Sequence, residues 1–591
     1  MYHETYTLTD GSAPLYSPES GFGFVDLSKA EGKTDSKRAL RAGGWNLRRS
    51  FPYSFSSSVR ADASGVYVTS PRQMAVFKAD VPEFGTYRVR VDMTASQAVN
   101  NMSLFAGRRD LIGRGICVPE GESFSRTFFM RVTPYIPALT SVPDTEAAIY
   151  ISVTGQNAGL SRVTIERADA PVLYIAGDST VTDQNAPAPY YPYDCTNGWA
   201  QDLAQYFPSA AVCNFAHSGL TTNCFRDDGH WDILWQYLCP GDTCFIQFGH
   251  NDQKRRNLAA FGGYINNLRW YVKKIRERNA FPVICSPISR IPETDADTGK
   301  PYSLLTLHAL AAKQAAEELQ VPFIDLHALT FARWCSLGDS VHDYFVDGTH
   351  TNEYGGCLIA GIVASEIRRQ NIRPAAELLS PQPQVLPPFT PDMDTKQLPK
   401  EPAGPGMFDI DIPYVDIDGC PQYEGIVRAF RGGLLDPCIM HLHPDAVMPR
   451  AQLLMVLFKA LRICGARPYE GYFPDLGRYE WDSSYVQACL NEDLIDPATV
   501  KDGFFRPDDP LTCEEFASFA ERGMASMQLR AGISLSAAFA QALADGVLPA
   551  GAKRAAAICR GDVYAGLARV MELLGTAKKA LPRDAEIHPV G

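Results

Sequence analysis

The stretch YIAGDSTVTDQ, residues 174–184, decides the fold of the central part of the chain. An apolar run over residues 172–176 leads into it and stops at Gly177, and Ser179 follows two residues later. A short, continuous apolar run predicts a buried strand of the kind found in parallel sheets that are covered on both faces. A serine just beyond such a strand has two interpretations: the N-cap of a helix, or a nucleophile at the edge of the sheet.

Residues 169–378 repeat this pattern and predict an α/β domain. The strand-like runs VLYIAG, AVCNFA, DTCFIQFG, PVICSPI and VPFIDL alternate with helix-like stretches such as GWAQDLAQYF, FGGYINNLRWYVKKIRERN and TLHALAAKQAAEELQ. Apolar strands separated by helices indicate a parallel sheet with helices on both faces, and therefore a three-layer domain.

Three further regions flank this domain. Residues 1–168 hold short segments rich in β-branched and aromatic residues, such as TYRVRVDM and AAIYISVTG, which predict a β-sandwich. Residues 379–415 are dense in proline and predict a semi-rigid linker. Residues 416–591 show three weakly similar helical units with a period of about 50 residues, which indicates an all-α repeat domain.

Composition narrows the partners and the compartment. The 591 residues carry a net charge of −12, which disfavours nucleic acid and anionic membranes, because both need a basic face. No run reaches the length needed for membrane insertion. The 15 cysteines follow no framework spacing, and the N-terminus does not read as a signal peptide. We therefore expect a cytoplasmic protein as the sequence stands, and a secreted or cell-surface protein if a leader has been removed.

Four segments of the α/β domain end an apolar run with a small residue and then a polar group. The segments AGDST, NFAHSGLTT, FIQFGHNDQK and DYFVDGTHTNEYGG supply, in order, Ser179, Gly219, Asn251, and the pair Asp347 and His350. Because the carboxyl ends of parallel strands open on the same crevice, we expect these residues to converge there.

Their chemistry fits acyl transfer. A serine hydroxyl needs a base within hydrogen-bond reach, and an imidazole needs a carboxylate that fixes its tautomer, so His350 and Asp347 suit Ser179. Developing charge on an ester oxygen needs aimed donors. The backbone N–H groups of Ser179 and Gly219 and the side-chain amide of Asn251 are the candidates. Taken singly, these residues also fit a helix cap, an exposed loop pair and a turn.

These segments resemble the four blocks of the SGNH/GDSL hydrolases: Gly-Asp-Ser, a glycine, Gly-x-Asn-Asp and Asp-x-x-His. The form GDSTVTDQ…GWAQDL…NFAHSG…FIQFGHNDQK…DGTHTNEYG is similar to the rhamnogalacturonan acetylesterase branch, in which Ser-Thr replaces Ser-Leu in the first block. The resemblance covers roughly residues 1–370. It implies a flavodoxin-like (SGNH) catalytic domain behind a galactose-binding-like β-sandwich, with Ser179 as nucleophile, Gly219 and Asn251 in the oxyanion hole, and Asp347 and His350 completing the triad.

The remaining candidates concern binding. Thr180, Tyr191, Trp199 and His250 are the expected substrate contacts, although the aromatic residues fit core packing equally well and His250 also fits a buttress for the Asn251 loop. The repeats of residues 416–591 resemble S-layer homology domains, with the degenerate signatures MPRAQ, LTCEE and ICRGD, and imply a cell-wall glycan as a further partner.

The sequence thus predicts a serine carbohydrate esterase without metal or organic cofactor. Its expected substrate is an acetylated plant polysaccharide or oligosaccharide, with pectic rhamnogalacturonan first. Two alternatives stay open: a GDSL-type lipase or acylhydrolase that acts on another ester, and a non-catalytic glycan- or cell-wall-binding protein.

Overall fold

The computed structural model groups the chain into two compact units. The first comprises Met1–Asp252, Ala260–Pro292 and Leu305–Asp411, and the second comprises Gln253–Ala259, Glu293–Leu304 and Ile412–Gly591. Most of the expected linker lies outside the described residues. The structure describes residues 2–30, 35–48, 51–138, 140–295, 297–380, 412–461, 463, 469–478, 480–495, 500, 502–527 and 535–575.

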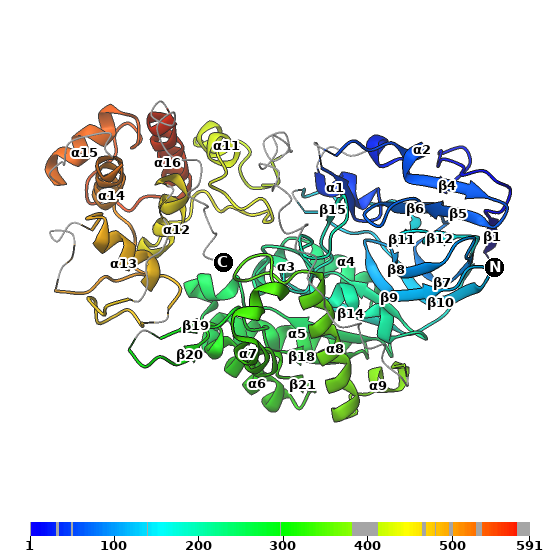
Figure 1. The fold of residues 1–591 in the computed structure, drawn as a ribbon. Helices are drawn as coiled ribbons and strands as arrows, with labels where there is room; N and C mark the ends of the chain where they lie inside the picture. Colours follow the sequence, from blue (N-terminus) through cyan, green and yellow to red (C-terminus); the bar gives the residue numbers. More distant parts are fainter. Residues whose placement is uncertain are drawn as a thin grey trace. The chain divides into compact units, whose positions relative to one another are not determined.

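A nine-stranded sheet runs through the first unit (Figure 1). Its order is β1 (His3–Thr7), β13 (Arg162–Arg167), β7 (Gly85–Thr94), β10 (Ser123–Val132), β16 (Ala211–Asn214), β14 (Val172–Gly177), β17 (Thr243–Gln247), β18 (Phe281–Cys285) and β21 (Phe323–Ile324). The last five strands are parallel, and in chain order they run 2-1-3-4-5, as in flavodoxin-like sheets. The crevice of such a sheet lies at the carboxyl ends of β14 and β17, where the order reverses.

Helices cover both faces of the parallel part, so the expected three-layer arrangement is present. Val172, Tyr174 and Ala176 of β14 pack on one face, while Leu173 and Ile175 pack on the other. The first face is covered by α3 (Thr222–Asp227), α4 (His230–Tyr237), α5 (Ile265–Glu277) and α6 (Thr306–Leu319), and the second by α7 (Leu326–Leu337), α8 (Glu353–Gln370) and α9 (Ala375–Leu378).

The stretch GWAQDLAQYF forms two short 3₁₀ helices, η2 (Trp199–Asp202) and η3 (Ala204–Tyr206), in place of the expected α-helix. The backbone at Gly198 lies so close to residues 181 and 182 that an added Cβ would come within 2.4 Å of the Thr182 nitrogen. The backbone N–H of Trp199 donates to the Thr180 carbonyl at 3.2 Å, which ties the start of η2 to the loop after β14.

The N-terminal β region is joined to the α/β region by hydrogen bonds between strands. Strand β10 pairs with β7 on one side and, in parallel, with β16 on the other, through Phe129↔Ala211 and Met130↔Val212. The sheet therefore runs across the boundary expected at residue 168. A second sheet packs on the same apolar core, in the order β2 (Phe22–Phe24), β6 (Met74–Asp80), β11 (Ala148–Thr154), β8 (Val99–Ala106) and β9 (Asp110–Val118).

Shorter elements complete this region, and its galactose-binding-like character stays a prediction. A three-stranded sheet follows the order β12 (Gly159–Leu160), β5 (Gly65–Val68) and β4 (Val59–Asp62), and a parallel pair joins β15 (Ala186–Ala188) to β3 (Trp45–Leu47). Two short helices are α1 (Asp35–Leu40) and α2 (Phe55–Ser58).

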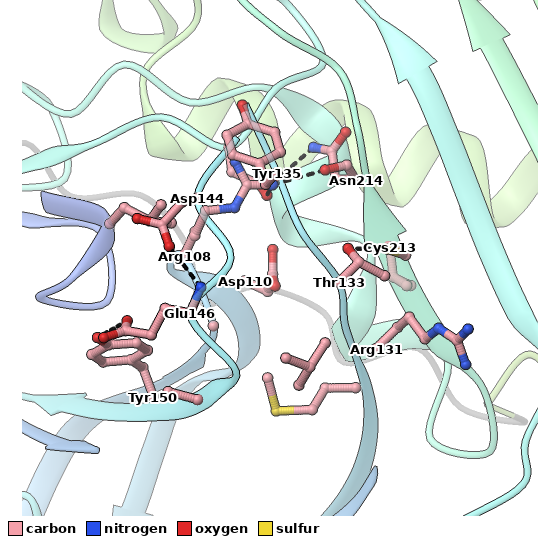
Figure 2. Close-up of a pocket in the computed structure, with 17 residues that line it drawn as sticks. Arg108, Asp110, Arg131, Thr133, Tyr135, Asp144, Glu146, Tyr150, Cys213 and Asn214 are labelled. Atoms are coloured by element: carbon pink, nitrogen blue, oxygen red, sulfur yellow. Dashed lines mark hydrogen bonds and ion pairs between the residues drawn. The ribbon is translucent and has the colours of Figure 1, made fainter. Parts of the chain in front are cut away.

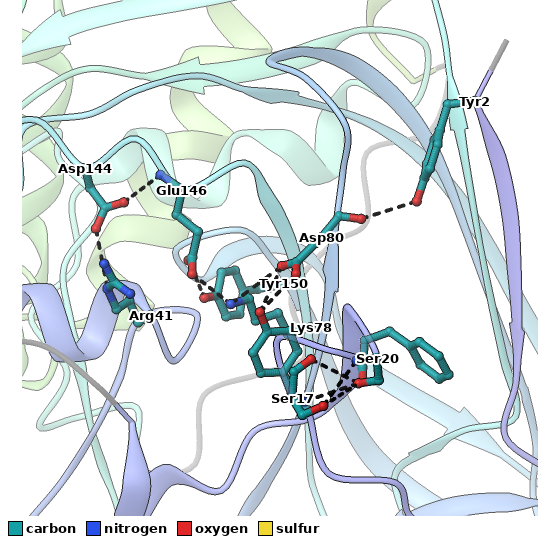
Figure 3. A network of polar contacts seen from close by, with 11 residues as sticks. Tyr2, Ser17, Ser20, Arg41, Lys78, Asp80, Asp144, Glu146 and Tyr150 are labelled. Atoms are coloured by element: carbon teal, nitrogen blue, oxygen red, sulfur yellow. Dashed lines mark hydrogen bonds and ion pairs between the residues drawn. The ribbon is translucent and has the colours of Figure 1, made fainter.

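A buried lysine anchors a polar network in the N-terminal β region (Figure 3). Lys78 of β6 places its ammonium group 2.7 Å from a carboxylate oxygen of Glu146 and 3.8 Å from the centroid of the Tyr16 ring. The other Glu146 oxygen accepts a hydrogen bond from the Tyr150 hydroxyl at 2.6 Å. A buried charge is tolerated when it is paired in this way, and removal of one partner would leave the other buried and unpaired between β6 and β11.

The second unit contains helices that begin at the three degenerate signatures. Among its described residues, Met448 N–H donates to Ile558 O, Ile558 N–H to Leu511 O, and Leu511 N–H to Met448 O, at 2.9–3.0 Å. This closed ring of hydrogen bonds joins equivalent positions of the three helical repeats. The S-layer resemblance stays a prediction. The helices are α11 (Tyr423–Arg431), α12 (Arg450–Leu461), α13 (Ser483–Asn491), α14 (Cys513–Ser526), α15 (Leu535–Ala544) and α16 (Arg560–Gly575), and a short hairpin joins β19 (Glu293–Thr294) to β20 (Pro301–Tyr302).

Within the described residues, every helix is too short or too polar to cross a membrane.

Candidate active site

Ser179 lies in a tight turn at the end of β14 and caps no helix. Gly177 is the last residue of β14, and a Cβ there would come within 2.7 Å of the Gln247 carbonyl oxygen, so the position requires glycine. The turn is held by Asp178, whose carboxylate accepts the backbone N–H and the hydroxyl of Thr180 at 3.0 and 2.8 Å. No helix begins among residues 178–184, and Ser179 keeps 8% of its surface exposed. Of the two interpretations of this serine, the geometry favours the nucleophile.

A histidine and an aspartate from the loop before α8 meet this serine. The Ser179 Oγ lies 2.8 Å from His350 Nε2, and His350 Nδ1 lies 2.8 Å from an Asp347 carboxylate oxygen. Backbone bonds pair Phe345 with Thr351 and Val346 with His350, so the loop folds back on itself and places both side chains together. The serine and the histidine are 171 residues apart in the chain, and their convergence is the geometry expected from the sheet topology.

The carboxylate of Asp347 stays ionised at neutral pH. Burial alone would raise its pKa, but the hydrogen bond and charge of His350 and the backbone N–H groups of His350 and Thr349 outweigh burial and lower the pKa to about 2. An ionised carboxylate on Nδ1 fixes the imidazole tautomer and leaves Nε2 to accept the serine proton. Burial, by contrast, raises the pKa of Asp178, whose oxygens are used to hold the turn.

Gly219 and Asn251 lie on loops that contact one another. Gly219 has φ +79°, a backbone conformation that favours glycine. The side-chain amide of Asn251 donates to the carbonyl of the next residue, Leu220, at 3.1 Å. Gln184 then joins this loop to the nucleophile, because its side-chain amide donates to the Ser179 carbonyl at 3.0 Å and to the Ser218 hydroxyl at 3.2 Å.

Two of the expected substrate contacts, Trp199 and Thr180, are buried beneath the nucleophile turn in this structure. Trp199 is fully buried, and its indole N–H donates to Gln247 Oε1 at 2.8 Å. Thr180 is 1% exposed, and its hydroxyl accepts from Gln247 Nε2 at 2.9 Å while donating to Asp178. The chain of bonds from Trp199 through Gln247 and Thr180 supports the nucleophile turn. A glutamine inside the apolar run FIQFG is the sequence signal that would have pointed to Gln247.

Tyr191 and His250 are buried as well, so neither presents a surface to a sugar in this structure. The Tyr191 ring packs 4.9 Å from Tyr193, and burial of the two rings leaves 4% and 7% exposed. His250 is 1% exposed, and its backbone N–H donates to Asp178 at 3.3 Å. These residues fit the packing and buttressing interpretations that the sequence left open.

The site can therefore transfer an acyl group. A hydroxyl is hydrogen-bonded to an imidazole whose other nitrogen meets an ionised carboxylate, which is the arrangement that turns serine into a nucleophile. Gln184 joins the loop that carries Gly219 to the nucleophile turn, and the Asn251 side chain contacts that same loop at Leu220.

Comparison with known proteins gives the same class of chemistry. A family model described as the GDSL-like Lipase/Acylhydrolase family matches residues 175–356. Three proteins of Bacillus subtilis (strain 168) are similar to this chain. Rhamnogalacturonan acetylesterase RhgT is 32% identical over 212 residues, which cover 33% of this chain and 88% of that protein. The probable rhamnogalacturonan acetylesterase YesY is 30% identical over 210 residues, which cover 33% and 92%. The uncharacterized esterase YxiM is 25% identical over 334 residues, which cover 54% and 80%.

Proposed function

Since this chain belongs to the GDSL-like lipase/acylhydrolase family and is a carboxylic ester hydrolase, we propose that it removes acetyl groups from acetylated poly- or oligosaccharides with Ser179 as nucleophile. The single observation that carries this proposal is the pair of 2.8 Å contacts that join Ser179 to His350 and His350 to Asp347. A serine held only as a structural residue has no need of both contacts.

The proposed reaction has two halves. Ser179 Oγ attacks the acetyl carbonyl carbon while its proton passes to His350 Nε2. The tetrahedral intermediate collapses when the bond to the sugar oxygen breaks, and that oxygen takes the proton from His350 and leaves as an alcohol. Water then attacks the acetyl-enzyme and gives a proton to His350, the bond to Ser179 Oγ breaks as that oxygen takes the proton back, and acetic acid leaves and ionises in solution. Asp347 balances the positive imidazolium in each half.

The oxyanion of each intermediate would be met by three donors. These are the backbone N–H groups of Ser179 and Gly219 and the side-chain amide of Asn251. The left-handed backbone at Gly219 supports this role, because a residue without a Cβ lets a carbonyl oxygen approach the backbone closely. The contact of Asn251 with Leu220 holds its amide against the loop that carries Gly219.

The acetylated sugar we propose is pectic rhamnogalacturonan. Support comes from the two relatives of 32% and 30% identity, which carry the name rhamnogalacturonan acetylesterase and are covered over 88% and 92% of their length. The catalytic part of this chain thus spans nearly all of each of those proteins.

A chain-length series and a polysaccharide panel test the proposal. With p-nitrophenyl acetate, butyrate and decanoate, we expect kcat/KM to fall by at least about 10-fold from acetate to decanoate, because an acetyl site excludes extra methylenes. Acetate release is expected to be faster from acetylated rhamnogalacturonan than from acetylated xylan at equal acetyl content. A preference for decanoate would support the acylhydrolase alternative, and hydrolysis of p-nitrophenyl acetate without release from any polysaccharide would remove the carbohydrate substrate.

A further inference from the structure

The hairpin of β8 and β9 sends arginine side chains from the N-terminal β region into the α/β region. Arg109 stands at its turn with φ +77°, which is uncommon for a residue other than glycine. Its side chain is fully buried and donates to the Asn197 side chain at 3.1 Å. Unfavourable backbone conformations persist where the surrounding contacts hold them in place. The contacts of Arg108 and Arg114, in the same hairpin, show which parts of the α/β region hold this turn.

Arg108 lies beside Tyr135 and Asn214 (Figure 2), and it reaches Asp183 in the loop that follows the nucleophile. Its guanidinium lies 2.7 Å from the carboxylate of Asp183, whose side chain is 3% exposed. It also donates to the Asn214 carbonyl at the end of β16 at 2.8 Å, and it stacks 3.5 Å from the centroid of the Tyr135 ring. One guanidinium nitrogen makes both polar contacts while the guanidinium lies over the ring, a combination that suits arginine better than lysine.

Asp183 and Asn214 carry this contact to the two loops of the site. The side-chain amide of Asn214 donates to the Val181 carbonyl at 2.9 Å and to Asp183 at 2.6 Å. The side-chain oxygen of Asn214, Oδ1, accepts a hydrogen bond from the Ala216 backbone N–H at 3.0 Å. Asn214 therefore ties the turn that bears Ser179 to the loop that leads to Gly219, and Arg108 holds the junction.

A second connection runs from the Arg108 backbone to the nucleophile itself. The side-chain amide of Gln201 donates to the Arg108 carbonyl at 3.0 Å and to the Gln184 carbonyl at 3.1 Å. The Gln184 side chain in turn donates to the Ser179 carbonyl and the Ser218 hydroxyl. A shift of the hairpin turn would thus reach the nucleophile through two glutamines.

Arg114, on β9 of the same hairpin, holds the loop that carries the base. Its guanidinium contacts the carboxylate of Glu353, and the two side chains are 5% and 0% exposed. Glu353 is the first residue of α8, three residues after His350, and its other oxygen accepts the Tyr190 hydroxyl at 2.7 Å. The side chain of Asn352 caps α8 by accepting the backbone N–H groups of Tyr354 and Gly355. The start of this helix is therefore held both by its cap and by the contacts of Glu353 with Arg114 and Tyr190.

We propose that Arg108 and Arg114 are positioning residues, and that the β8–β9 hairpin completes the catalytic site by holding the nucleophile turn and the base loop at their reacting distance. The inference rests on the proposed function and adds a role for the N-terminal β region, which is then part of the esterase. A misplacement of about 1 Å between reacting groups costs about 100-fold in rate, so small movements of either loop suffice to show the effect.

The test compares Arg108→Gln, Arg108→Lys and Arg114→Gln in the full chain, with p-nitrophenyl acetate as substrate. We expect each glutamine variant to lower kcat by about 10- to 100-fold while KM changes less than about 2-fold, because the site is displaced and the substrate surface is kept. Arg108→Lys keeps the charge and is expected to recover part of the lost kcat. Arg162→Gln is the matched control, since Arg162 pairs with Asp92 on the exposed side of β13.

Asp183→Asn provides a second route to the same contact if Arg108→Gln fails to fold. It removes the partner charge with little change of shape, and the double variant Arg108→Gln/Asp183→Asn is expected to lose no more kcat than the worse single variant. Wild-type kcat in Arg114→Gln and Asp183→Asn would overturn the inference. The proposed function fails separately, through Ser179→Ala that keeps its turnover, so the two failures are distinguishable.

Discussion

Ser179→Ala is expected to lower kcat for p-nitrophenyl acetate by about 10⁴- to 10⁶-fold. The hydroxyl is the group that bonds to the acetyl carbon, and alanine removes it while leaving His350 and Asp347 in place. The substitution deletes one oxygen from a side chain that is 8% exposed, so we expect little change in the thermal midpoint. Steady-state kinetics and thermal unfolding of the same preparation separate these two quantities.

Ser365→Ala is the matched control for this variant. Ser365 lies on α8 and donates to the Gly361 carbonyl at 2.7 Å within its own helix, on an exposed face. Its variant is expected to keep wild-type kcat. Turnover by Ser179→Ala within 10-fold of wild type would mean that another group attacks the ester.

Asp347→Asn is expected to lower kcat by about 10⁴-fold, because an amide on His350 Nδ1 favours the wrong tautomer and leaves no negative charge to balance the imidazolium. His350→Ala removes the base itself and should cost at least as much. Adding Asp347→Asn to His350→Ala is expected to cost little more, since the two residues act as one unit. Fully additive losses would show that the two residues act separately.

The pKa of Asp347 also predicts a pH effect on stability. Its folded pKa of about 2 lies below the ordinary value of 3.8, so the carboxylate stabilises the folded chain above about pH 4. That contribution is lost as the pH falls from about 4 towards 2. The difference in free energy of unfolding between wild type and Asp347→Asn should therefore narrow over this pH range in denaturant titrations. A difference that stays constant would contradict this prediction.

The sequence predicted the strand ends because their signal is local. An apolar run that stops at Gly177 needs a parallel sheet to cover it, and the polar residue just beyond is then carried to the crevice. The same logic placed His350 and Asp347 beside Ser179 across 171 residues. The sequence could not decide whether Ser179 capped a helix, since that depends on the backbone after it.

The aromatic residues and the arginines mark what a single sequence leaves open. A tyrosine or tryptophan in a loop suits a sugar face and a core equally, so the sequence leaves both roles open for Trp199 and Tyr191, and the structure buries both side chains. Arg108 and Arg114 stand in a region with no catalytic pattern. Asp183 lies 75 residues after Arg108 in the sequence, and Glu353 lies 239 residues after Arg114. Such pairs follow from the sheet that joins the two regions, and strand pairing between β10 and β16 leaves no local signal.

The most direct measurement of the central claim is covalent labelling of the nucleophile. The full chain is incubated with a serine-directed p-nitrophenyl phosphonate, and the modified peptide is located by mass spectrometry as esterase activity is lost. We predict one phosphonyl group per chain, on Ser179, with p-nitrophenol released in equal amount and no adduct in Ser179→Ala. An adduct on a different serine that tracks the loss of activity, or complete loss of activity with Ser179 unmodified, would contradict it.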